Sequence, residues 1–158
     1  ELGGSEYYAH FGYVGLNVPR VIPDEFVVLY KALGDAVEKE IVASAHGIYR
    51  GGLGVHLAMV AMGVNLGMSV DMGRVPAEQT DRNDLILFSE SAGRFIVTID
   101  PKDREVFEKI FKGLACSCIG AVTYTPEIII QGIDNRRIMK VTVQDLKAAW
   151  KKPFGELI

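Results

Sequence analysis

The first candidate for chemistry is a glycine pair preceded by an arginine and a histidine. In the stretch SAHGIYRGGLGVHLAMVAM, residues 44–62, His46 and Arg50 lie in a polar turn that leads through Gly51 and Gly52 into an apolar run. The first N–H groups of a helix have no partner inside it and lie at the positive end of its dipole, so a helix starting here could hold a phosphate or carboxylate beside the guanidinium. Two glycines also permit close approach of a backbone or ligand. The alternative is an ordinary glycine-rich turn with a surface arginine.

A second polar cluster, SESAGR, comes directly before an apolar run. Ser89, Glu90, Ser91 and Arg94 bring two hydroxyls, a carboxylate and a guanidinium into six residues. Hydroxyls and backbone N–H groups at such a turn can bind phosphate, and an arginine can chelate one with two hydrogen bonds. The alternative here is a capped turn with an internal ion pair between Glu90 and Arg94.

The remaining reactive residue types predict little chemistry. A histidine at a strand end, as expected for His46, is often a structural hydrogen-bond partner, and we assign no role to His10 or His56. Cys116 and Cys118 lie in an apolar segment that looks like a strand, where their separation is at the far edge of disulfide geometry, so we expect buried free thiols. No carboxylate pair, nucleophile elbow or Walker loop occurs, and no second Cys/His pair has ligand spacing. We therefore predict no catalytic residue and no metal ligand.

Composition narrows the class of protein. The chain has 158 residues, the size of one domain, and its 49% hydrophobic content favours a well-packed core. A net charge of −3 without a basic run gives no electrostatic footprint for nucleic acid. No stretch approaches the roughly 20 apolar residues that span a bilayer. We expect a cytoplasmic domain that binds neither nucleic acid nor membrane.

Periodicity predicts the elements that position the first cluster. A helix is expected over residues 24–42, capped by Asp24, with an apolar stripe formed by Phe26, Tyr30, Leu33, Val37 and Ile41. A buried strand is expected over 43–48, and a further strand over 66–72. Between them we predict a helix from Leu53 to about Gly63, whose buried face is Leu53, Leu57, Val60 and Ala61. Strand, helix and strand in this order make a plausible βαβ unit.

The residue pattern of the second half of the chain predicts shorter helices and strands. We expect helical turns over 81–88, a strand over 95–99 that is buried on both faces, and a helix opening at Pro101 whose core residues are Val106, Phe107, Ile110, Phe111 and Leu114. Strands follow over 116–123, 127–133 and 137–143, with Asp134 and Asn135 as a hairpin turn, and a helix over 144–151. The result is one domain of mixed α and β structure.

The two clusters resemble known motifs when they are taken together. AHGIYRGGLGVHLA and LFSESAGRFIVTI resemble, in order and spacing, the C-terminal domain of the aminoimidazole ribonucleotide (AIR) synthetase superfamily. The pattern FSES-x-x-RF is the most specific part, and it is most similar to the last C-terminal domain of phosphoribosylformylglycinamidine (FGAM) synthases. The opening LGGSEYY resembles the junction before that domain. The chain departs from the family pattern in having Gly47 where Asp is usual and Tyr49 where Ser is usual.

The resemblance implies both a fold and an activity. It implies an α+β domain over residues 1–158, with a mixed sheet packed with helices and residues 1–20 as the junction to a preceding domain. The parent would be a ligase of purine biosynthesis that amidates formylglycinamide ribonucleotide with ATP, using ammonia from a glutaminase subunit. ATP and Mg²⁺ would be held mainly by the N-domains of the same polypeptide, so we expect the isolated domain to be inactive. The glutaminase and a small accessory subunit are the implied partners.

The resemblance also implies that this domain helps to form a pseudo-active site for phosphate or nucleotide. The candidate binding residues are His46, Arg50, Gly51, Gly52, Ser89, Glu90, Ser91 and Arg94. Two alternatives remain. The chain could belong to another ATP-dependent enzyme of the superfamily, of the AIR synthetase, selenophosphate synthetase, thiamine-phosphate kinase or hydrogenase-maturation type, or it could be a non-catalytic domain for dimerisation or subunit docking.

Overall fold

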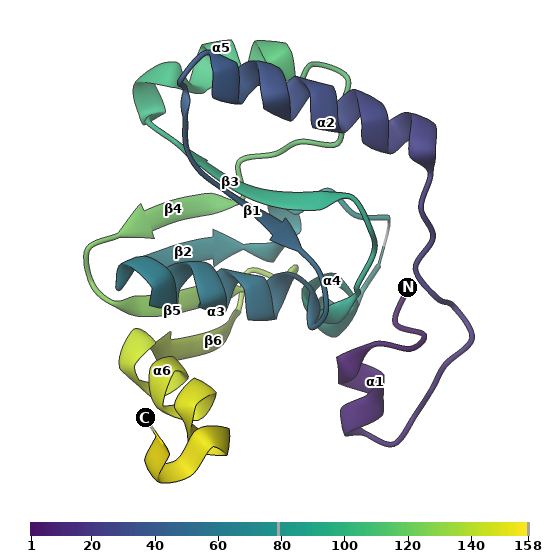
Figure 1. The fold of residues 1–158 in the computed structure, drawn as a ribbon, viewed down its shortest axis with the longest axis vertical. Coiled ribbons are helices and arrows are strands. Elements are labelled where there is room, and N and C mark those ends of the chain that lie inside the picture. Colours follow the sequence, from purple (N-terminus) through teal and green to yellow (C-terminus); the bar gives the residue numbers. More distant parts are fainter. Residues whose placement is uncertain (79, 158) are drawn as a thin grey trace. The chain divides into compact units, whose positions relative to one another are not determined.

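The computed structural model describes residues 1–78 and 80–157, which form helices and two β-sheets (Figure 1). The chain divides into two compact units: unit 1 is Glu1–His56 with Leu87–Ser117, and unit 2 is Leu57–Ile86 with Cys118–Ile158. Helices together with parallel and antiparallel strand pairs confirm the α+β prediction. The prediction of a single domain over residues 1–158 stays a prediction. Within the described part of the chain, no helix is both long enough and apolar enough to cross a membrane.

Unit 1 is built on a two-stranded antiparallel sheet. Its strands are β1 (Val42–Ile48) and β3 (Arg94–Ile99), and its helices are α1 (Glu6–His10), α2 (Pro23–Glu38), η2 (Pro101–Asp103) and α5 (Arg104–Ile110). The unit also contains the first turn of α3 (Gly52–Val64) and the end of α4 (Asn83–Phe88). In the register, Val42 lies opposite Ile99 and Ile48 lies opposite Arg94. The end of β1 therefore lies beside the start of β3, which is where the two predicted clusters occur.

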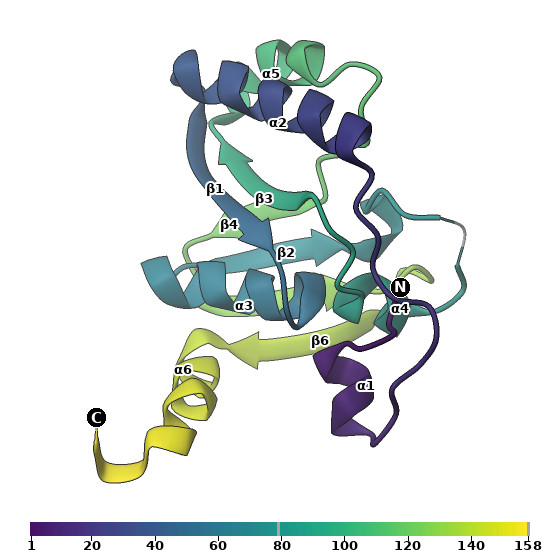
Figure 2. The ribbon, with the colours of Figure 1, turned by 45° about the vertical axis from the view of Figure 1, so that its right-hand side comes forward.

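The core of unit 1 lies between the sheet and a pair of helices. Helices α2 and α5 lie side by side (Figures 1 and 2). The buried residues of this cluster are Ala32, Leu33, Ala36, Phe107 and Phe111, and the partly buried residues packed against them are Leu29, Ile41, Val42, Phe95, Val97, Ile99, Ile110 and Leu114. The Phe107 and Phe111 rings stack at 4.5 Å between centroids. Burial of these side chains stabilises the unit by roughly 1.5–3 kcal/mol for each large residue.

Unit 2 is built on a four-stranded mixed sheet with the order β4-β2-β5-β6. The strands are β2 (Gly67–Asp71), β4 (Gly120–Thr123), β5 (Glu127–Gln131) and β6 (Arg137–Thr142), and the helices are the rest of α3, η1 (Met72–Arg74), the start of α4, α6 (Val143–Lys151) and η3 (Lys152–Leu157). Strand β2 runs parallel to β5 and antiparallel to β4. Ile128 and Ile130 of β5 are buried, as period-two alternation requires.

Several local predictions are confirmed. Leu53, Leu57 and Ala61 form a buried face of α3, while Val60 is half-buried. The hairpin predicted at Asp134 and Asn135 joins β5 to β6. Asn135 adopts a positive φ of 60°, which asparagine tolerates better than most residues.

The βαβ prediction is wrong. Strand β1 pairs with β3, whereas β2 belongs to the sheet of unit 2. The order strand, helix, strand was read correctly, but it does not specify which strands exchange hydrogen bonds. The prediction that residues 95–99 are buried on both faces is also wrong, because every residue of β3 is only half-buried.

The predicted cysteine strand is shorter than expected. Strand β4 begins at Gly120, and Cys116 and Cys118 lie outside it with exposed side chains. The prediction of buried thiols is therefore wrong, since it depended on an apolar strand that includes them. The hydrophobic composition of this segment did not distinguish a buried strand from an exposed connection between elements.

The long helix of unit 1 also differs from its prediction. Helix α2 begins at Pro23 after Ile22, so Asp24 is a first-turn residue and not the cap. It ends at Glu38, because Glu40 has a positive φ of 57° and the chain then turns into β1. The side chains of Phe26, Tyr30 and Val37 are exposed, because the buried residues of α2 are Ala32, Leu33 and Ala36. Val106 on α5 is exposed as well, and Phe107 is the buried residue of that helix.

Candidate functional site

The structure brings the two predicted clusters together within unit 1. Because β1 pairs with β3, the turn after β1 meets the turn before β3. Gly51 donates its backbone N–H to Oε1 of Glu90 at 2.8 Å, across 39 residues of sequence. The clusters so joined contain all eight predicted binding residues: His46, Arg50, Gly51 and Gly52 from the first, and Ser89, Glu90, Ser91 and Arg94 from the second.

The glycine pair allows this close approach. Gly51 and Gly52 have positive φ values of 89° and 69°, which an L side chain rarely adopts. A Cβ on Gly52 would lie 2.6 Å from the carbonyl oxygen of Ser89 and 2.8 Å from that of Leu87. The start of α3 therefore packs directly against the backbone at residues 87–89, as the glycine pair led us to expect.

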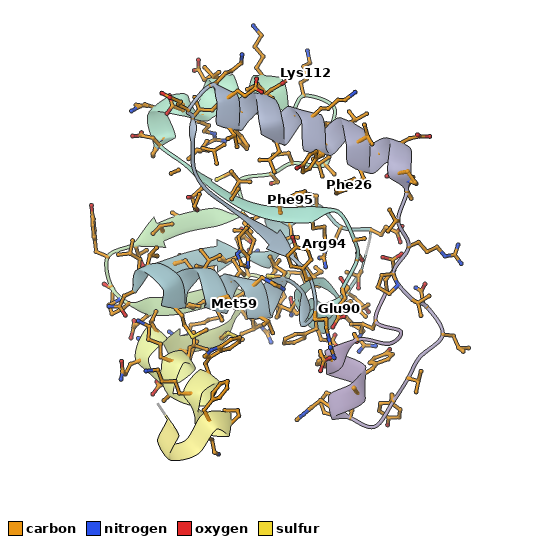
Figure 3. All side chains as sticks on the ribbon, viewed as in Figure 1. Phe26, Met59, Glu90, Arg94, Phe95 and Lys112 are labelled. Carbon is orange, nitrogen blue, oxygen red and sulfur yellow. The ribbon has the colours of Figure 1, made fainter. Side chains whose placement is uncertain are left out.

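Glu90 holds three segments of unit 1 in place. The same Oε1 atom that accepts the N–H of Gly51 also accepts the N–H of Glu6 at 2.8 Å. Figure 3 shows Glu90 beside α1. A carboxylate at the beginning of α3 is favoured by the helix dipole and by charge-assisted hydrogen bonds. In this conformation the carboxylate of Glu90 accepts the N–H of Gly51, at which we expected a phosphate to bind.

The two arginines of the clusters have different environments. Arg50 has a side chain that is 83% exposed and forms an ion pair with Glu6. Arg94 is half-buried, and its guanidinium donates hydrogen bonds to two carbonyl oxygens, that of Ser91 at 3.0 Å from Nε and that of Ser89 from Nη2. Burial lowers the pKa of Arg94 from its ordinary value, and the charge of Glu1 partly opposes this. Arg94 therefore shapes its own turn.

The alternative of an internal pair between Glu90 and Arg94 is wrong. The ion pairs among the described residues do not include these two side chains. Each is engaged with the backbone: Glu90 with N–H groups and Arg94 with carbonyl groups. The hydroxyls of Ser89 and Ser91 form no hydrogen bond with another described residue, so they are available to a ligand.

The sequence analysis missed His56. This side chain is only 4% exposed, and it lies within hydrogen-bond distance of His46, with 2.8 Å between Nδ1 of His56 and Nε2 of His46. Its Nε2 accepts the backbone N–H of Tyr49 at 2.9 Å. One signal was present in the sequence: His56 follows Leu53 by three residues, which places a polar group on the buried face of α3, and a buried polar group requires a partner.

Binding of ATP with Mg²⁺ requires side chains that hold a metal ion and polar groups that can contact phosphate. Among residues 1–78 and 80–157, no group of three or more His, Cys, Asp or Glu side chains could hold a metal ion. The N–H of Gly51 and the guanidinium of Arg94 already have protein partners. Arg50 is 83% exposed although it pairs with Glu6, and the hydroxyls of Ser89 and Ser91 form no hydrogen bond with another described residue. The cluster thus presents a guanidinium and two hydroxyls that could contact a phosphate, but among the described residues it contains no group of side chains that could hold a metal ion.

Comparison with known proteins identifies the family. The family model described as "AIR synthase related protein, C-terminal domain" matches residues 3–133, so the chain belongs to this family. Phosphoribosylformylglycinamidine synthase subunit PurL of Thermococcus sibiricus is 33% identical over 150 residues, which is 95% of this chain and 20% of the relative. The chain thus spans about a fifth of the length of the curated relatives that it matches.

Solved structures of a related protein have the same fold. Thermotoga maritima PurL complexed with FGAR superposes with a TM-score of 0.70 and 26% identity, covering 80% of this chain and 21% of PurL. PurLQS from the same organism gives a TM-score of 0.72 and 26% identity, covering 80% of this chain and 22% of the matched one. The complex of that PurL with ATP gives 0.67 and 27%, covering 75% and 21%.

Proposed function

We propose that this chain is the C-terminal domain of an FGAM synthase and contributes to the ATP-dependent amidation of formylglycinamide ribonucleotide. The observation that carries the proposal is the relative from T. sibiricus, whose similarity extends over 95% of this chain. The family match over residues 3–133 and the superposition on PurL complexed with FGAR support it. The motif-bearing turns also meet in space, as residues of one site must.

The parent reaction is one of purine biosynthesis, in which a ligase forms a C–N bond with ammonia taken from glutamine. ATP supplies the driving force of that reaction, and Mg²⁺ is the metal that accompanies it. We assign both mainly to the N-domains of the parent enzyme, as the resemblance of the two motifs to this family implies. The complexes of T. maritima PurL with ATP and with ADP support a nucleotide in the parent enzyme. We assign no catalytic residue to this chain.

Within the parent, the cluster would contact a phosphate group of the nucleotide or the substrate. Arg50 is exposed and carries a fixed positive charge, and the hydroxyls of Ser89 and Ser91 lack protein partners among the described residues. Gly51 and Gly52 bring the backbone to these groups, while His46, Glu90 and Arg94 maintain the shape of the two turns. Release of Gly51 by Glu90 would add a backbone N–H to the phosphate contacts.

The proposed partners are the preceding N-domains of the same polypeptide, a glutaminase subunit and a small accessory subunit, in the cytoplasm. The structure named PurLQS from T. maritima supports an assembly of this kind. An activity assay on the chain with FGAR, ATP, Mg²⁺ and ammonia should give no product, and the same assay on the complete synthase should give FGAM. A chain that converts FGAR unaided would contradict the proposal.

Calorimetric titration with ADP, ATP and FGAR, with and without Mg²⁺, tests the phosphate contact. In the complete synthase, Arg50→Ala should weaken binding of nucleotide or FGAR by about tenfold, because one charge-assisted contact is lost. Arg136→Ala is the matched control: that side chain is 87% exposed, is also paired with a carboxylate, and lies on the hairpin of unit 2. Equal affinities for both variants would remove Arg50 from the proposed site.

A further inference from the structure

His56 is a buried residue whose two ring nitrogens are both engaged. Nε2 accepts the N–H of Tyr49, so this nitrogen carries no proton. A neutral imidazole has one N–H, and it must therefore lie on Nδ1, which faces Nε2 of His46 at 2.8 Å. His56 thus donates to His46. The hydrogen bonds run from His46 on β1, through His56 on α3, to the backbone of Tyr49.

This chain of hydrogen bonds ends at the turn that carries the proposed phosphate contacts. Tyr49 precedes Arg50, and its carbonyl oxygen accepts the N–H of Gly52 at 3.0 Å. The N–H and the C=O of Tyr49 are consequently both fixed, one by His56 and the other by the glycine pair. The ring of Tyr49 also meets the His56 ring edge-on, with 5.7 Å between centroids. A change at His56 would therefore loosen the backbone immediately before Arg50.

We propose that His56 is a positioning residue: its neutral Nδ1–H form fixes the turn of Tyr49, Arg50, Gly51 and Gly52, and a proton on Nε2 releases that turn. A proton on Nε2 removes the acceptor used by the N–H of Tyr49 and sets two N–H groups against each other. The role of this turn in ligand binding rests on the proposed function. The geometry of the hydrogen bonds does not depend on that role.

The surroundings of His56 favour its neutral form. Burial is the main cause that lowers the pKa of His56 below its ordinary value of 6.5, and His46 on β1 lowers it further. The backbone at Arg50 opposes these two effects less strongly; Arg94 on β3 lowers the pKa by a smaller amount, and the charge of Glu90 raises it least. At neutral pH the acceptor at Nε2 is therefore available to Tyr49, and acidification removes it.

Two substitutions of His56 distinguish loss of the hydrogen-bond acceptor at Nε2 from protonation of the side chain. In His56→Gln, the amide oxygen stands at the position of Nε2, so it can accept the N–H of Tyr49 but cannot be protonated in this range. In His56→Asn, the side chain reaches only the position of Nδ1, so that acceptor is lost. Circular dichroism and thermal melting show whether each variant of the chain folds.

The decisive measurement is NMR of the ¹⁵N-labelled chain between about pH 5 and pH 8. We expect the Nδ1–H tautomer for His56, and a Tyr49 amide whose protection from exchange falls as His56 takes up a proton. The Gln variant should keep that protection without the pH dependence, and the Asn variant should lose it roughly tenfold at every pH.

Two results would overturn the inference. One is an Nε2–H tautomer for His56 in the wild-type chain, a measurement that needs no variant to fold. The other is equal protection of Tyr49 in the Gln and Asn variants. The failure of the phosphate proposal would be recognised separately: the tautomer and the protection pattern would be as expected, but the complete synthase would bind nucleotide and FGAR equally with wild-type and Arg50→Ala chains.

Discussion

Units 1 and 2 of this chain differ in what holds their turns and strands in place. In unit 2, β5 alternates buried and half-buried residues, and its hydrogen bonds to β2 and β6 follow a regular register with one irregularity at its end. In unit 1, the sheet has two strands, and the turns beside it are fixed by single polar side chains: Glu90, Arg94 and His56. The two-stranded sheet itself is stabilised by packing against α2 and α5, whereas the turns beside it depend on these polar side chains.

Each unit is therefore sensitive to a different kind of mutation. The stability of unit 2 should fall mainly when apolar side chains are truncated. The stability of the turns of unit 1 that carry the proposed binding residues should fall when backbone geometry or single hydrogen-bond partners change. The proposed binding residues all belong to unit 1. The proposed site and the turns held by single polar side chains therefore occur in the same unit.

The largest effect is expected for Ile130→Ala in β5. Ile130 is 1% exposed, so truncation leaves a cavity and should lower the free energy of unfolding by about 2–5 kcal/mol. Ile138→Ala on β6 is the matched control, because that side chain is 40% exposed and should cost less than about 1 kcal/mol. Urea unfolding of the three chains measures both values. Equal losses would contradict the view that apolar burial holds unit 2.

Gly52→Ala should have the next largest effect. Its positive φ and the carbonyl oxygens of Leu87 and Ser89 leave no room for a Cβ, so we expect a loss of about 3 kcal/mol in denaturant unfolding. Gly34→Ala in the middle of α2 is the control. A Cβ on Gly34 would have no neighbouring atom within 4 Å, and alanine there should stabilise the chain by up to about 1 kcal/mol. Effects of the same sign would contradict the steric role of Gly52.

Glu90→Ala should cost about 2 kcal/mol, because two backbone N–H groups lose a charged acceptor. Glu90→Gln keeps an oxygen acceptor without the charge and should cost roughly half as much. Glu38→Ala, on the exposed side of α2, should change stability by less than about 0.5 kcal/mol. Hydrogen exchange at the Gly51 and Glu6 amides locates the effect. Unchanged protection in Glu90→Ala would show that Glu90 does not hold these segments.

The smallest expected effect is a dependence of stability on pH. Because the pKa of His56 is lowered in the folded chain, the unfolded chain binds a proton first as the pH falls below about 6.5. The contribution of His56 is therefore fully present above that pH and is lost as the pH falls through the folded-state pKa. Thermal melting from pH 8 to pH 5 should show a smaller decline in His56→Gln than in wild type. An identical decline would assign the pH dependence to other groups.

The amino-acid sequence by itself determined the helices and turns that depend on local signals. Hydrophobic periodicity located α3, α5 and α6 to within a few residues, and Asp134 with Asn135 located the β5–β6 hairpin. The two motifs also identified the family and the segments that form the candidate site. These features could be predicted because the residues that determine them are close together in the chain.

Only the tertiary structure decided which distant segments meet. Periodicity states that a strand has a buried face but not which strand pairs with it, so the partner of β1 was predicted wrongly. The contacts of Glu90 with Gly51 and Glu6 span 39 and 84 residues. Through them the N–H of Gly51, which we expected to bind a ligand, donates to a side chain of the protein instead. His56 gained its partners in the same way: a polar group on a buried helix face requires a hydrogen bond, but only the folded backbone supplies the atoms that make it.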